Sequence, residues 1–205
     1  MTPVPVRVCL LGPVAVLDGD GCPVDVGGPR ARALLARLAA EPGRVVGLDA
    51  LIDALWDGAP PAAPGNAVQA VVSRLRRALP ELSLRAQAHG YVLELPVDAV
   101  DSAAFEQLVA RARGERDPQR VVALLDEAEA LWRGPALADL RDLAFTAAPA
   151  TRWTELRLGA AEQRLAAALV LGRAGAVLPE LEELAAAHPL RETFAVLLVL
   201  SLIHI

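Results

Sequence analysis

Two adjoining segments decide the fold of this chain: Pro64-Gly-Asn-Ala-Val-Gln-Ala-Val-Val-Ser-Arg-Leu-Arg-Arg-Ala-Leu79 and Leu84-Arg-Ala-Gln-Ala-His-Gly-Tyr-Val-Leu-Glu-Leu95. At about 100° per residue, an α-helix places the apolar residues of the first segment on one side. These residues are Val68, Val71, Val72, Leu75 and Leu79, and the opposite side carries Asn66, Gln69, Ala70, Ser73 and Arg77. The pattern predicts an amphipathic helix that packs on a core by its apolar stripe. The second segment predicts a short hairpin.

The polar side of this helix has the residue types that read bases. Asparagine and glutamine pair with adenine in the major groove, and arginine pairs with guanine. Arg74 and Arg76 flank that side, where they suit phosphate contacts that set affinity and register. A helix with clustered arginines beside a hairpin is typical of a winged-helix DNA-binding domain. The same pattern is also typical of an amphipathic helix whose polar face is only solvated, so both interpretations stay open at this point.

Composition and charge bound the remaining possibilities. The 205 residues suit one large domain or two modest ones, and 54% of them are hydrophobic, enough for a core. The net charge is −5, and all 20 basic residues are arginine. Residues 1–95 hold nine arginines and nine acidic residues, whereas residues 66–91 hold four arginines and one glutamate. Because local patches bind phosphates, the first half suits DNA and the acidic second half does not.

Several functional classes find no support in the sequence. Cys9 and Cys22 are expected to be small core residues, and the three histidines are scattered without the spacing of metal ligands. Gly27-Gly28 lacks the Lys-Ser/Thr that follows in a phosphate loop, and no nucleophile elbow or zinc motif occurs. The N-terminus lacks the apolar core of a signal peptide. We therefore expect a cytoplasmic protein without membrane contact that is not an enzyme and has no cofactor, metal or catalytic residue.

The first half predicts a small α/β domain over residues 1–97. Strands are expected over residues 6–11, 14–17 and 23–26, separated by Gly-Pro and Asp-Gly turns. A helix opens at Gly27-Gly-Pro-Arg30 and ends at Glu41-Pro-Gly43, and a second covers residues 48–56. Three strands, three helices and a terminal hairpin form the order of the winged helix in response regulators.

The second half, residues 98–205, predicts an all-α domain. Apolar residues recur at helical spacing from Asp101 onward, almost everything there is expected to be helical, and Arg133-Gly-Pro135 breaks the pattern. Long segments over residues 149–172 and 176–188 suggest helix pairs of tetratricopeptide type. Trp56, Trp132 and Trp153 are expected in the core. The fold class is therefore mainly α with a small β component: a response-regulator-type winged helix followed by a TPR-like helical domain.

Several ordered motifs carry a family resemblance. The chain resembles the SARP family, the antibiotic regulatory proteins that activate secondary-metabolite genes, over residues 4–194. In the first half the motifs are Gly28-Pro-Arg-Ala-Arg-Ala-Leu-Leu35, Gly43-Arg-Val-Val46, Leu51-Ile-Asp-Ala-Leu-Trp56, residues 67–79 and Gly90-Tyr-Val-Leu93. In the second half, Val100-Asp-Ser-Ala-Ala-Phe-Glu106, Ala130-Leu-Trp-Arg-Gly-Pro135 and Ala187-His-Pro-Leu-Arg-Glu192 look like the family's bacterial transcriptional activator domain.

The resemblance implies a transcriptional activator that binds direct repeats in double-stranded DNA near a promoter and recruits the RNA polymerase holoenzyme, with a possible homodimer on DNA. On that basis the groove contacts are Asn66, Gln69, Ser73 and Arg77, and the phosphate contacts are Arg74, Arg76, Arg30 and Arg32. Arg85, Gln87 and His89 are the candidates in the wing. Arg30 and Arg32 are equally typical of solvated side chains, and His89 of a plain turn residue. The alternative function is a helical protein–protein interaction module whose winged helix does not bind DNA.

The C-terminal tail departs from the family pattern. Ala195-Val-Leu-Leu-Val-Leu-Ser-Leu-Ile-His-Ile205 is apolar on all sides, whereas the family pattern has polar positions in this helix and further helices after it. The tail is shorter than the roughly 20 residues that span a bilayer. The sequence therefore suggests a truncated or misassembled reading frame from about Thr193, with exposed leucine and isoleucine that favour aggregation or dimerisation. No nucleotide-binding module of the larger relatives is recognisable.

Overall fold

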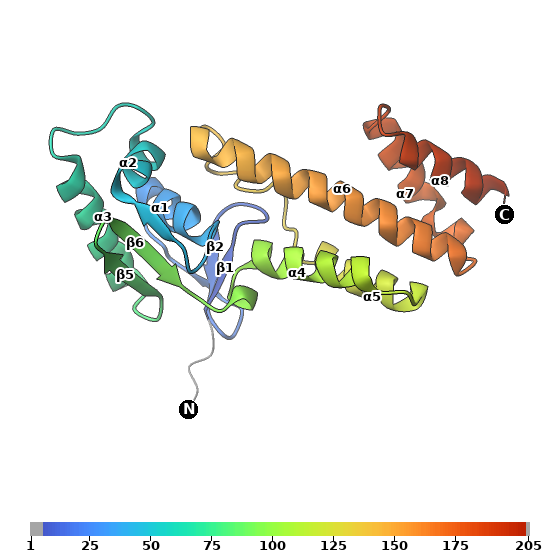
Figure 1. The fold of residues 1–205 in the computed structure, drawn as a ribbon, viewed down its shortest axis with the longest axis horizontal. Coiled ribbons are helices and arrows are strands. Elements are labelled where there is room, and N and C mark those ends of the chain that lie inside the picture. Colours follow the sequence, from blue (N-terminus) through green and yellow to red (C-terminus); the bar gives the residue numbers. More distant parts are fainter. Residues whose placement is uncertain (1–5, 204–205) are drawn as a thin grey trace. The chain divides into compact units, whose positions relative to one another are not determined.

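The computed structural model describes residues 6–203. Two compact units make up the chain (Figure 1). The first comprises Met1–Ala104 and Leu131–Thr154, and the second comprises Phe105–Ala130 and Glu155–Ile205. The units are thus interleaved in sequence, because residues 131–154 belong to the first unit.

The first unit contains two three-stranded antiparallel sheets and three helices. One sheet has the order β1-β2-β3 and the other β4-β6-β5. In chain order the elements are β1 (Arg7–Cys9), β2 (Ala15–Leu17), β3 (Pro23–Val24), α1 (Pro29–Ala39), β4 (Val45–Gly47), α2 (Leu48–Trp56), α3 (Pro64–Ala78), β5 (Ser83–Gln87) and β6 (Gly90–Glu94). This order confirms the predicted winged helix, in which the β5–β6 hairpin is the wing.

The three helices pack on one another around a leucine-rich core. Helix α1 contacts both α2 and α3, and its Leu34, Leu35 and Leu38 are fully buried. Strand β4 closes the core by pairing with β6, where Gly47 lies opposite Gly90. A Cβ atom on Gly90 would lie 1.9 Å from the carbonyl oxygen of Val46, so only glycine allows this pairing. The root of the wing is therefore fixed to the helical core.

The segment Leu131–Thr154 completes the first unit. The backbone N–H groups of Arg133 and Leu137 donate to the carbonyls of Leu11 and Leu10. Asp101 is buried and accepts the N–H groups of Leu10 and Leu11 at 2.6 and 3.0 Å, with Arg133 3.7 Å away. Burial raises the pKa of Asp101, and the hydrogen bonds and Arg133 act against that rise. These contacts, which join residues 90 or more positions apart in sequence, anchor the end of β1.

The second unit consists of helices. They are α4 (Asp101–Gly114), α5 (Pro118–Glu129), α6 (Ala147–Val170), α7 (Ala174–Ala187) and α8 (Glu192–Ile203), of which α4 and α6 begin in the first unit. The core of the unit brings together Val122, Leu165, Leu181 and Phe194. Helix α8 buries Phe194, Leu197 and Ser201, and it leaves several apolar side chains more than half exposed, namely Val196, Val199, Leu202 and Ile203. No helix within residues 6–203 has the length and hydropathy needed to cross a membrane.

The predicted fold class, mainly α with a small β component, is confirmed, and four local expectations need correction. Residues 130–143 form turns and bends instead of α-helix, and the short 3-10 helices η1 (Val97–Ala99) and η2 (Ala144–Thr146) directly precede α4 and α6. Trp153 is fully buried as expected, but Trp56 and Trp132 are only partly buried. Cys22 is exposed in the turn before β3, whereas burial raises the pKa of the Cys9 thiol to about 11.

Candidate nucleic-acid interface

Helix α3 has the two faces that its periodicity predicts. The apolar stripe is buried, and none of its side chains is more than 6% exposed: Val68, Val71, Val72, Leu75 and Leu79. The opposite face is open to solvent at Asn66, Gln69, Ser73 and Arg77. The buried stripe therefore holds the helix on the core with these four polar side chains directed outward. This is the geometry that a helix needs to present side chains to a groove.

The charge on α3 has one sign. Its 15 residues contain three arginines and no aspartate or glutamate. Within the described residues Arg74 has no ion pair or hydrogen-bond partner, and Arg77 donates only to the carbonyl of Ser73, at 3.3 Å. Two guanidinium groups on one exposed face are thus left without a carboxylate. Such a face attracts phosphates, which contribute most of the affinity in protein–DNA complexes.

Arg76 differs from its two neighbours. Its Nε and one terminal nitrogen donate to the carbonyl of Leu84 in β5, at 3.0 and 2.8 Å. The side chain therefore connects α3 to the wing. A guanidinium group has five N–H donors, so three remain for the expected phosphate contact. The structure gives Arg76 a positioning role that the sequence does not reveal.

The wing presents polar side chains at its tip and an ion pair on its strands. Gln87 is exposed at the end of β5, and His89 is exposed in the two-residue turn that follows it. Arg85 pairs with Glu94 of β6 at 3.1 Å, and Ser83 donates to the same carboxylate. The positive charge expected from Arg85 is therefore offset locally. Gln87 and His89 remain the candidates for DNA contact in the wing.

The two arginines near the start of α1 have partners that sequence analysis missed. Arg30 lies with its guanidinium carbon 5.7 Å from the centre of the partly buried Trp56 ring, a cation–π arrangement. Arg32 pairs with Asp139 at 3.3 Å, and Asp139 also accepts the N–H of Val14. Arg32 thus connects α1 to the segment 131–154. No local pattern predicts a partner that lies 107 residues away.

Two open pockets border the exposed face of α3. One, of about 330 Å³, joins Gly27–Ala31 at the start of α1 to Arg74 and Ala78 of α3. The other, of about 600 Å³, lies between Gln69, the start of α2 and the wing residues Gln87–Tyr91, and it includes Asp49. Asp49 was not a sequence candidate because it lies 20 residues before Gln69. A carboxylate at this place can accept a hydrogen bond from cytosine.

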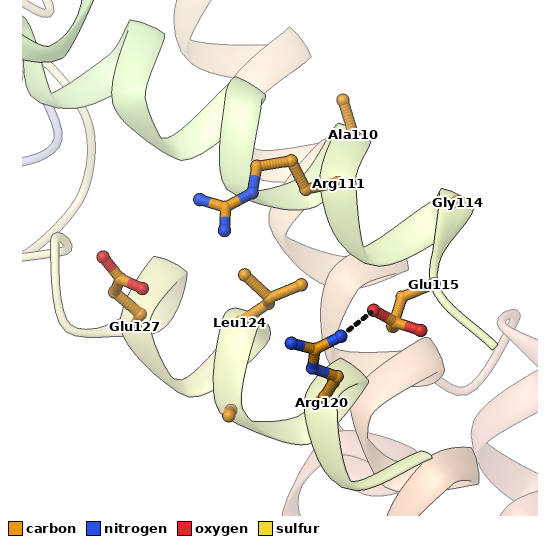
Figure 2. Close-up of a pocket in the computed structure, with 8 residues that line it drawn as sticks. Ala110, Arg111, Gly114, Glu115, Arg120, Leu124 and Glu127 are labelled. Atoms are coloured by element: carbon orange, nitrogen blue, oxygen red, sulfur yellow. Dashed lines mark ion pairs between the residues drawn. The ribbon is translucent and has the colours of Figure 1, made fainter. Parts of the chain in front are cut away.

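A further pocket lies in the second unit. Figure 2 shows it between α4 and α5, with Arg111 and Glu127 on either side of Leu124. Arg120 pairs with Glu115 at 3.8 Å, and Glu115 also accepts the backbone N–H groups of Arg116 and Asp117, which lower its pKa. Two arginines and two glutamates give this pocket no net charge. It therefore does not extend the positive surface of α3.

Comparison with protein families and relatives identifies the chain. The bacterial transcriptional activator domain model matches residues 100–205, and the model for the C-terminal part of transcriptional regulatory proteins matches residues 26–93. The chain belongs to the SARP family. The second match covers the elements from α1 to β6. The exposed face of α3 therefore lies in the part that this SARP chain shares with other transcriptional regulatory proteins.

Individual relatives agree with the family models. This SARP chain is 38% identical over 196 residues to the transcriptional regulatory protein EmbR of Mycobacterium tuberculosis, covering 89% of the chain and 49% of EmbR. It is 36% identical over 207 residues to the transcriptional regulator RedD of Streptomyces coelicolor, covering 96% of the chain and 59% of RedD. A solved structure of M. tuberculosis EmbR in complex with a low-affinity phosphopeptide superposes with a TM-score of 0.88 at 36% identity, covering 96% of the chain and 54% of EmbR. The chain thus spans about half the length of these relatives.

Proposed function

We propose that this chain is a sequence-specific DNA-binding transcriptional activator, with α3 as its recognition helix. The observation that carries the proposal is the exposed face of α3, which presents Asn66, Gln69, Ser73 and Arg77 on a helix with no acidic residue. The family model for transcriptional regulatory proteins also matches this part of the chain, residues 26–93. The activity belongs in the cytoplasm, where bacterial DNA lies, and it needs no catalytic residue, metal or cofactor.

The roles of individual residues follow from their partners. Arg77 and Gln69 lie on the exposed face and are assigned to bases, while Arg74 is assigned to a phosphate because it has no partner in the described chain. Arg30 stands beside the pocket at the start of α1, where a phosphate would also meet Arg74. Gln87 and His89 are assigned to DNA beside the major groove. Arg32 and Arg85 are the weakest candidates, because each is already paired with a carboxylate.

The biological setting of the proposal rests on family membership. SARP members bind direct repeats near promoters of secondary-metabolite genes and recruit the RNA polymerase holoenzyme, and we propose the same for this chain. Two copies on adjacent repeats would form a homodimer on DNA. The acidic second unit and the exposed apolar side chains of α8 suit contacts with protein more than with DNA.

Selection from random double-stranded DNA, followed by footprinting on the enriched sequence, tests the proposal. We expect enrichment of a site present as a direct repeat, with protection of both copies. Transcription in vitro with the polymerase holoenzyme on a promoter carrying that site should then rise when the chain is added. No enrichment at low salt would reject DNA binding and would favour the alternative, a helical interaction module whose winged helix contacts only proteins.

A further inference from the structure

We propose that Asp49 of α2 is a further specificity-determining residue, which selects cytosine close to the base that Gln69 contacts. The inference rests on the proposed DNA-binding function and extends base reading from α3 to the start of α2. The group assigned to Asp49 is the N4 amino group of cytosine, which is exposed in the major groove.

Position is the first reason for this assignment. Asp49 and Gln69 line the same open pocket, of about 600 Å³, together with residues 86–91 of the wing. Both side chains are exposed, and they come from two different helices of the first unit. A DNA group that enters this pocket and meets Gln69 therefore also comes near the carboxylate of Asp49.

The start of α2 is held in place on two sides. The backbone N–H of Leu48 donates to the carbonyl of His89 in the wing at 2.9 Å. On the side of α3, a Cβ atom on Gly65 would be in van der Waals contact with Leu48, 3.8 Å from its Cδ2. Asp49 is the next residue in the chain, so its backbone is fixed relative to both the wing and the recognition helix. Such a fixed position is what a specific contact requires.

Charge is the second reason, because it limits the groups that Asp49 can contact. Within residues 6–203 its carboxylate has no ion pair or hydrogen-bond partner, and no arginine of that range lines the pocket. A carboxylate repels DNA phosphates, and it accepts hydrogen bonds without donating any. Its partner on DNA is therefore a donor. The donors that bases present in the major groove are the amino groups of cytosine and adenine.

Cytosine suits this carboxylate better than adenine does. Adenine presents the acceptor N7 beside its N6 amino group, an arrangement that suits the amide of Gln69 and repels a carboxylate. Cytosine presents its N4 amino group in the groove without an acceptor of its own. An acidic residue in the first turn of α2 also interacts favourably with the helix dipole. That second role concerns stability and does not depend on the DNA sequence, so base preference separates the two roles.

Selection from random double-stranded DNA with the whole chain tests the proposal, using the wild type, Asp49→Asn, Asp49→Ala and Asp53→Asn. Asp53 is the matched control, an exposed aspartate one turn later in α2 that does not line the pocket. The wild type and Asp53→Asn should enrich the same site, with cytosine at one defined position. Asp49→Ala should keep the rest of the site and lose about tenfold of the preference for that cytosine. Asp49→Asn should accept adenine there, because an amide pairs with N6 and N7.

Two results would overturn the inference while DNA binding itself stands. One is an unchanged cytosine preference in both Asp49 variants. The other is a gain in affinity for all sequences alike that is equal in Asp49→Asn and Asp53→Asn, which would show that the carboxylate only repels phosphates. Failure of the proposed function gives a different result, because the wild-type chain would then enrich no DNA sequence, and both proposals would be rejected together.

Discussion

Helices α3 and α7 have nearly the same length and opposite charge. The 15 residues of α3 contain three arginines and no acid, whereas the 14 residues of α7 contain three glutamates and no base. Both helices bury an apolar side, with Leu75 in α3 and Leu181 in α7 almost completely covered. Packing therefore constrains one side of each helix in the same way. The difference lies in what the exposed sides do.

Glu180 of α7 helps to hold the second unit together. Glu180 pairs with Arg164 of α6, and Arg164 also lies 3.5 Å from Asp126 of α5. Arg191 likewise binds Glu155 and Glu162 of α6 at 2.9 and 2.7 Å. Arg74 of α3, by contrast, has no such partner in the described part of the chain. Unpaired like charges on one helix repel each other, and the proposed binding of DNA phosphates would relieve that repulsion on α3.

The largest effects are expected from the buried side of each helix. Leu75→Ala and Leu181→Ala should each lower the free energy of unfolding by about 2–5 kcal/mol, because a cavity replaces a buried leucine. Hydrogen exchange, followed separately for peptides of the two units, should place the first loss in the first unit and the second loss in the second. Only Leu75→Ala should abolish DNA binding. Equal loss of DNA binding from Leu181→Ala, with normal exchange in the first unit, would contradict the distinction.

A smaller effect is expected from the exposed side of α3. Arg77→Ala should weaken binding to the selected DNA site by about 1–3 kcal/mol and relax the preference at one base position. The measurement is a binding titration against the selected site and against sites changed at single positions. Arg113→Ala, which removes an exposed arginine of α4, is the matched control and should leave affinity unchanged. An unchanged base preference in Arg77→Ala would remove this residue from base reading.

The smallest effect is expected where α3 meets the wing. Arg76→Ala removes two hydrogen bonds to the Leu84 carbonyl and should cost about 1 kcal/mol of stability, since the site is partly exposed. Amide exchange in β5 should become faster while exchange in α1 stays the same. Arg76→Lys should restore part of the protection, because an ammonium group can still donate to one carbonyl. Unchanged exchange in β5 would show that the arginine does not hold the wing.

Local patterns predict the parts of the fold that local forces determine. Apolar periodicity is sufficient to predict α3. The Gly-Pro and Gly-Tyr dipeptides, which mark turns and strand ends, are sufficient to predict the strands and the wing. Asp101 pairs with Leu10 and Arg32 pairs with Asp139, about 90 and 107 positions apart in sequence. The periodicity of a helix or a strand is local and does not predict such contacts. For the same reason the sequence predicts a break at Arg133-Gly-Pro135 but not that residues 131–146 belong to the first unit.

The sequence likewise predicts only part of the candidate site. The exposure of Asn66, Gln69, Ser73 and Arg77 follows from helical geometry alone, and the structure agrees with it. The different states of Arg74, Arg76 and Arg85 do not follow from the sequence, because each depends on which backbone carbonyl or carboxylate lies nearby. Residue type indicates that an arginine can bind phosphate. Only its surroundings show whether its donors are free to do so.

The salt dependence of DNA binding tests the central claim, that unpaired arginines on α3 contact DNA phosphates. The logarithm of the binding constant should be measured against the logarithm of salt concentration for the wild-type chain, Arg74→Gln and Arg113→Gln. The account predicts that Arg74→Gln weakens binding to all sequences alike and lowers the slope by about one, while Arg113→Gln keeps the wild-type slope. A wild-type slope in Arg74→Gln, or an equal decrease in Arg113→Gln, would contradict it.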